Sequence, residues 1–255
     1  MKVLMVIAII EAKAFAYLLT GERHYADEAL YAIKNFILTL RVPYITSDQC
    51  REYGQVMTVA AKVYDWCYDL LTEDEKYRIF AGVINYTAAG TCGLAVGMGT
   101  EPFKIYGSPG KMEVGYPPRE QGCVSGHGSE GQVLRDYFSM AVAVYDEHPE
   151  WWEYVAARVY NDYLVQRNYY YKCGCAPQGN PTYAPFRMHY DLYSAYANKV
   201  LFGESPYIPE LTKAPRSLYC YELPNGQHFS EGDGVLFRRG DLFRGIVYPC
   251  AGVTY

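Results

Sequence analysis

The feature that most constrains the fold is a succession of long helical segments separated by short breaks. Apolar residues recur at the three- and four-residue spacing of a helix face, and Gly21 interrupts the first such run. Thr72 and Glu75 have the spacing of a capping box, and Pro149 is well placed to begin a helix. We predict helices over 3–19, 24–40, 50–71, 73–88, 129–146, 149–170 and 184–202. Such a series predicts a mainly α protein built from helical hairpins.

Two similar short segments suggest that the helical hairpins repeat along the chain. The segments "LLTGERHY" (18–25) and "VLFGESPY" (200–207) share leucine, glycine-glutamate and tyrosine at the same offsets. Repeated hairpins over 255 residues favour a toroid or a solenoid over a compact four-helix bundle. Chance similarity of two helix ends is the alternative.

The character of the chain changes in two places. Residues 90–126 are rich in glycine and proline and lack periodicity, as is typical of a functional loop or a disordered segment. Residues 216–255 alternate and turn like β-strands. We therefore predict a helical domain over 1–215 and the first strands of a β domain over 216–255.

Composition limits the classes of partner. The net charge of −5 argues against a nucleic-acid-binding protein. An acidic substrate stays possible, because six basic residues between 119 and 187 leave room for a locally basic cleft; the alternative is that each is separately solvated. The 28 tyrosines suit a carbohydrate surface, although most are expected to be packing residues. The sequence contains no run of 18 or more apolar residues, so membrane insertion is not expected. The composition does not indicate an oligomeric state.

The eight cysteines do not predict a metal site or a cofactor. Cys173 and Cys175 are separated by one residue, whereas zinc knuckles use two to four, and no second pair follows at metal spacing.

Two polar clusters are candidates for a functional site. If Ser129 caps a helix, His127 lies just outside it and Glu130 in its first turn, so both would lie at the positive end of the helix dipole. The alternative is a surface histidine and a glutamate that only complements the dipole. The second cluster lies at a loop-to-helix junction, where Tyr183 and Arg187 are one helical turn apart. A tyrosine is a possible proton carrier and an arginine a possible carboxylate clamp; the alternative is a capped helix start with packing tyrosines.

Three motifs in order resemble a known family. The segments "VYDWCYDLLTEDEKYRI", "GHGSEGQVLRDYFSMAVAVYDEHPEWWEY" and "QGNPTYAPFR" look like the helical domain of the heparinase II/III-like polysaccharide lyases, closest to heparinase II. The likeness covers most of residues 1–235. It implies an (α/α) toroid followed by β-sandwich material, and β-elimination of uronic-acid polysaccharides such as heparin and heparan sulfate.

The resemblance also implies roles for individual residues. His127 resembles the family's toroid histidine, Glu130 the acidic residue after it, and Tyr183 the catalytic tyrosine. Arg187 is a plausible substrate contact. Independently of the resemblance, further substrate-binding candidates are Gln178 and Asn180 at the loop-to-helix junction and Arg119 among the residues of the possible basic cleft.

The chain departs from the family in one respect. A further catalytic histidine, contributed in the family by the domain after the toroid, has no match here, and His228 does not lie in a motif that corresponds to it. With only seven expected helices, we interpret the chain as an incomplete toroid from a longer lyase. The parent protein is expected to be periplasmic or extracellular.

Two other function classes stay open. An inverting glycoside hydrolase on a helical toroid would pair Glu130 with Asp136 or Asp191 across roughly 6.5–9.5 Å, but this leaves Tyr183 without a role. A glycan-binding or inactive fragment would retain affinity for an acidic polysaccharide without turnover.

Overall fold

The computed structural model describes five parts of the chain: 2–39, 49–86, 132–174, 183–214, and most of 216–227. The described residues are mainly helical, which confirms the predicted class. The chain divides into two compact units, Met1–Arg158 and Val159–Tyr255, and each is described by itself.

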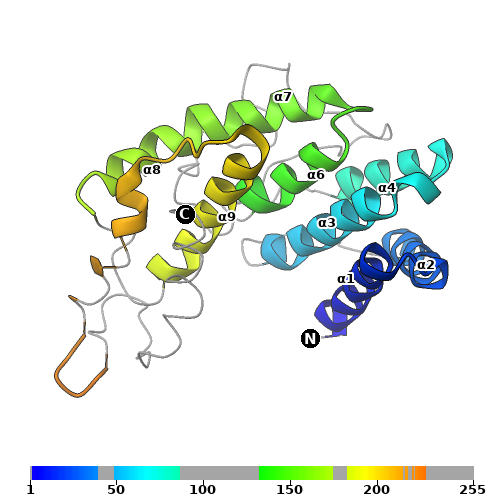
Figure 1. Ribbon diagram of the computed structural model, residues 1–255, viewed down its shortest axis with the longest axis horizontal. Coiled ribbons are helices and arrows are strands. Elements are labelled where there is room, and N and C mark those ends of the chain that lie inside the picture. The colour runs from blue at the N-terminus through cyan, green and yellow to red at the C-terminus, as the bar shows by residue number, and fades with distance from the viewer. Residues whose placement is uncertain are drawn as a thin grey trace. The chain divides into compact units, whose positions relative to one another are not determined.

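The first unit is built from packed helices (Figure 1). Helix α1 contacts both α2 and α3, and α3 in turn contacts α4, η2 and α6. The elements in chain order are α1 (Lys2–Thr20), α2 (Arg23–Thr39), α3 (Gln49–Trp66), η1 (Tyr68–Leu70), α4 (Glu73–Tyr86), η2 (Gln132–Tyr137), α6 (Phe138–Ala143) and α7 (Pro149–Ala157).

The α1–α2 hairpin forms where the sequence predicts it. Gly21 adopts a φ of 71°, and its amide donates a hydrogen bond of 2.8 Å to the carbonyl of Tyr17. Glycine adopts a positive φ without the steric strain that other residues incur, so the helix ends here and the chain reverses. Both Ile7 and Ile10 are buried on the inner side of α1.

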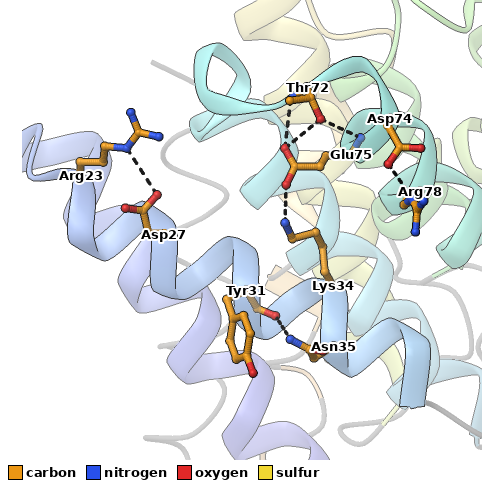
Figure 2. A network of polar contacts seen from close by, with 9 residues as sticks. All are labelled: Arg23, Asp27, Tyr31, Lys34, Asn35, Thr72, Asp74, Glu75 and Arg78. Atoms are coloured by element: carbon orange, nitrogen blue, oxygen red, sulfur yellow. Dashed lines mark hydrogen bonds and ion pairs between the residues drawn. The ribbon is translucent and has the colours of Figure 1, made fainter.

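The start of α4 confirms the capping box. The backbone amide of Glu75 donates to Thr72 Oγ1 at 3.3 Å, and the backbone amide of Thr72 donates to Glu75 Oε2 at 3.1 Å. Figure 2 shows this exchange together with Lys34 of α2, which pairs with the other oxygen of Glu75. One glutamate therefore caps α4 and ties it to α2.

The second unit contains a separate core. Its elements are the end of η3 (Arg158–Tyr163), α8 (Leu164–Tyr171), α9 (Tyr183–Phe202) and η4 (Pro209–Lys213). The core is formed by Tyr171, Met188, Leu192, Ala195, Tyr207, Leu211 and Ala214. Pro185 lies in the first turn of α9, where a missing amide hydrogen costs no helical hydrogen bond.

Each predicted helix corresponds to helical elements, but two end earlier than predicted. Helix α3 ends at Trp66 and is followed by η1, where 50–71 was expected, and α6 ends at Ala143, where 129–146 was expected. The 149–170 prediction corresponds to α7, η3 and α8 in succession, in which residues 158–163 are π-helical. Near the predicted strands, the described residues contain only a bridge at Glu222 and Gln227 around a tight turn. Residues 228–255 lie outside the described part, so the toroid, the β-sandwich and the 215/216 boundary stay predictions. Among the described helices, none is both long and apolar enough to cross a membrane.

Candidate functional site

Most of the predicted site lies outside the described residues. This applies to Arg119, His127, Glu130, Gln178 and Asn180. Their proximity to one another, and to α9, stays a prediction.

The described part of the predicted site is the beginning of α9. Tyr183 is the first residue of this 20-residue helix; its backbone is described, and its side chain is not. Arg187 follows one turn later and is only 4% exposed. The aligned peptide groups place partial positive charge at this end of the helix, which favours an anion such as a phenolate. The predicted proton carrier therefore begins a long helix and has a buried cation one turn behind it.

Arg187 belongs to a buried polar group that we call the Asp191 cluster: Arg167, Tyr171, Arg187, Asp191 and Tyr207. Tyr171 donates a hydrogen bond of 2.5 Å to Asp191 Oδ2, and Tyr207 donates one of 3.3 Å to Oδ1. Arg167 Nε lies 3.5 Å from Oδ1, and both of these side chains are fully buried. One carboxylate of α9 thus joins α8 to the segment that follows α9.

The electrostatics of the cluster are dominated by burial. Burial raises the pKa of Asp191 above its usual range, and the charges of Arg167 and Arg187 and the two tyrosine hydroxyls offset part of this rise. Burial and the neighbouring Asp191 carboxylate raise the pKa of Tyr171 and Tyr207 well above the ordinary value. Neither of these two tyrosines is therefore suited to act as a base near neutral pH.

The sequence contains a signal for this cluster that the motifs described above do not include. Val159, Tyr163, Arg167 and Tyr171 recur every four residues, and all four are fully buried. Arg167 therefore occupies a core position of an otherwise apolar stripe, and a charged residue at such a position needs a buried partner.

A second buried carboxylate lies in the first unit. Asp136 accepts a hydrogen bond of 2.6 Å from Thr58 of α3 and one of 2.6 Å from Arg135 Nε. It is fully buried against Gly54, where the absence of a side chain makes room for the carboxylate. Burial raises the pKa of Asp136, and the charge of Arg135 offsets part of the rise. Asp136 lies within the π-helical residues 132–137, a conformation that is frequent near functional sites.

These contacts bear on the hydrolase alternative. That alternative needs a water-accessible carboxylate beside Glu130, and both Asp136 and Asp191 are 0% exposed and hydrogen-bonded within the fold. A hydrolytic base must reach water, so neither residue is in the state that the hydrolase requires.

The described residues do not add a metal centre. No group of three or more His, Cys, Asp or Glu able to hold an ion is found among them. Cys173 is exposed, and its thiol donates a hydrogen bond of 3.0 Å to the carbonyl of Tyr170; Cys175 lies outside this part of the chain.

Comparison with known proteins adds no family assignment. Neither a scan against models of known protein families nor a search of curated proteins finds a match for this chain.

Proposed function

We propose that the chain is the helical part of a polysaccharide lyase that cleaves uronic-acid-containing glycosaminoglycans, of the heparin and heparan sulfate kind, by β-elimination. The observation that carries the proposal is the position of Tyr183 at the N-terminus of α9, one turn before the buried Arg187. This position supplies what a catalytic tyrosine needs, because its ordinary pKa of about 10 must fall before it can act as a base.

The chemistry assigns a different task to each candidate. Tyr183 as phenolate removes the C5 proton of the uronate, and as phenol it returns a proton to the leaving 4-linked oxygen. Glu130, if protonated, neutralises the substrate carboxylate through a short hydrogen bond while an enolate-like dianion forms. His127 serves either as a cation beside Tyr183 or as the base for the uronate epimer whose proton faces the other side.

The remaining candidates would bind the polymer. Arg119, Gln178 and Asn180 are proposed to contact the acidic sugars. Arg187 is buried, so its electrostatic effect on Tyr183 is better supported than a direct contact with a polysaccharide. No metal or cofactor enters the proposed reaction. We further propose that the chain is an incomplete toroid, with β-sandwich strands after residue 215, from a periplasmic or extracellular protein.

The test is the formation of an unsaturated uronate, which absorbs in the ultraviolet and which hydrolysis does not produce. The chain should be incubated with heparin, heparan sulfate and a glucuronate-rich polymer, and binding should be measured in parallel by calorimetry. Turnover supports the lyase; binding without turnover supports a glycan-binding fragment; saturated reducing ends would show a hydrolase. The absence of both binding and turnover would overturn the proposal.

Tyr183→Phe is the decisive variant. It keeps the ring and removes the hydroxyl, so elimination should fall by ~10²–10⁴ while folding is unchanged. Tyr196→Phe is a matched control, since Tyr196 lies on the same helix and is 53% exposed. Near-normal elimination by folded Tyr183→Phe would remove Tyr183 from the mechanism.

A further inference from the structure

The Asp191 carboxylate is held by contacts from elements other than its own helix. Hydrogen bonds reach it from Tyr171 of α8 and from Tyr207 of the segment after α9, and Arg167 of α8 forms an ion pair with it. The contacts use both carboxylate oxygens and come from two elements other than its own helix. Such a carboxylate has little freedom to rotate or shift.

The spacing of residues along α9 places Asp191 close to Arg187. Tyr183, Arg187 and Asp191 are each four residues apart, so they lie along one side of the helix. At 1.5 Å per residue, Arg187 is about 6 Å along the axis from Tyr183, and Asp191 is about 12 Å from it. An acidic residue four positions after an arginine is a neighbour with which its guanidinium can interact.

The burial of Arg187 makes this neighbour important. Arg187 as a whole residue is 4% exposed, so its guanidinium has little access to water, and a buried cation needs an anion close by. The charge of Arg187 favours the ionised form of Asp191, as expected for groups close enough to interact. The other groups that act on this carboxylate are Arg167, Tyr171 and Tyr207, and Ser194 interacts with Tyr207.

From these contacts we propose that Asp191 is a positioning residue for Arg187: its anchored carboxylate holds the guanidinium one turn behind Tyr183 and so maintains the ionisation of that tyrosine. This inference rests on the proposed function, in which Tyr183 is the proton carrier. Asp191 itself is too deeply buried to touch a polysaccharide.

The direction in which the pKa of Tyr183 changes when Asp191 is replaced separates three possible roles of Asp191. Loss of a negative charge alone would lower the pKa of Tyr183, because an anion opposes the phenolate. A purely structural role would leave this pKa unchanged in folded protein. Loss of a correctly held Arg187 would raise it, since an opposite charge within about 4–6 Å lowers a pKa by about 1–3.

The experiment is an ultraviolet titration of the whole chain, in which the curve of a Tyr183→Phe variant is subtracted to isolate the Tyr183 hydroxyl. In the parent protein Tyr183 should titrate below its ordinary value. In Asp191→Asn it should titrate at least about one pH unit higher, in the same direction as in Arg187→Met. Tyr196→Phe is the control: Tyr196 lies on the same helix, outside the Asp191 cluster, and is 53% exposed, so the titration of Tyr183 should stay as in the parent protein.

If Asp191→Asn does not fold, Asp191→Glu retains the charge and displaces it by one methylene, and a smaller rise is expected. An unchanged or lowered Tyr183 pKa in the folded variant would overturn the proposal, as would an ordinary value in the parent protein. The titration needs no substrate. Its failure is therefore distinguishable from failure of the lyase assignment, which would appear as an absence of unsaturated product.

Discussion

Replacing Gly54 by alanine should destabilise the first unit, although alanine is the better helix former. In the interior of α3, glycine-to-alanine would ordinarily stabilise by about 1 kcal/mol. Here the added Cβ would lie 1.7 Å from Oδ2 of Asp136 and 2.6 Å from its Cγ. Two atoms cannot approach so closely, so the carboxylate has to move.

The magnitude follows from what the movement breaks. Asp136 is held by hydrogen bonds of 2.6 Å from both Thr58 and Arg135. A hydrogen bond to a charged group contributes about 1.5–3 kcal/mol, and overpacking a buried site costs about 1–3 kcal/mol. After subtraction of the helix-propensity gain, we expect the free energy of unfolding to fall by about 2–4 kcal/mol.

Urea unfolding followed by tryptophan fluorescence suits this measurement. The three tryptophans, Trp66, Trp151 and Trp152, all belong to the Met1–Arg158 unit, so their emission reports on that unit. The midpoint should fall at an unchanged slope. As a control, Gly54→Ala in an Asp136→Ala background should lose its penalty and become neutral or stabilising. Equal costs in both backgrounds, or a stability at or above that of the parent protein, would refute the reasoning.

The remaining predictions concern the cap of α4 and the pH dependence of the first unit. Thr72→Ala removes the acceptor for the backbone amide of Glu75 and should lower the free energy of unfolding, measured in urea, by about 1 kcal/mol. Thr72→Ser keeps a hydroxyl acceptor and should retain most of that stability. Equal stabilities of the two variants would contradict the capping role. Because burial raises the pKa of Asp136 in the folded state, its contribution to stability is present below its unfolded pKa of about 3.9 and is lost as pH rises through the folded pKa. The unfolding free energy of the parent protein relative to Asp136→Asn should therefore decline as pH rises from about 4, and a difference that does not vary with pH would disprove it.

The parts of the fold that sequence predicts well are those fixed by local interactions. The hairpin at Gly21, the cap formed by Thr72 and Glu75, and the helix that begins at Pro149 all depend on residues within one or two turns. Such signals can be recognised without knowledge of the rest of the chain.

The buried polar clusters could not be found in this way. Asp136 and Asp191 are the possible partners of Glu130 in the hydrolase alternative, and acidic residues are usually exposed. Their burial depends on partners far away in the sequence: Thr58 is 78 residues from Asp136, and Tyr171 is 20 from Asp191. Gly54 likewise gives no sign in the sequence that its missing side chain accommodates a carboxylate.

In the candidate site too, features set by local spacing could be predicted and features set by long-range contacts could not. The spacing of Tyr183 and Arg187 on one helix was predictable, and α9 confirms it. The burial of Arg187 and its link to Asp191 were not, because an arginine near a helix start gives no indication of whether its head faces water. A shared site of His127, Glu130 and Tyr183 depends on long-range arrangement and stays a prediction.

The distant contacts in the first unit have a consequence for how this chain can vary. Thr58 meets Asp136 across 78 residues, and Lys76 meets Glu147 across 71, so direct contacts join α3 and α4 to the elements that follow residue 131. The entropy lost on closing a flexible loop grows only with the logarithm of its length, and doubling the length costs about 0.6 kcal/mol. If residues 90–126 form the predicted loop, a short insertion there that leaves Arg119 in place should therefore lower the free energy of unfolding of the first unit only slightly.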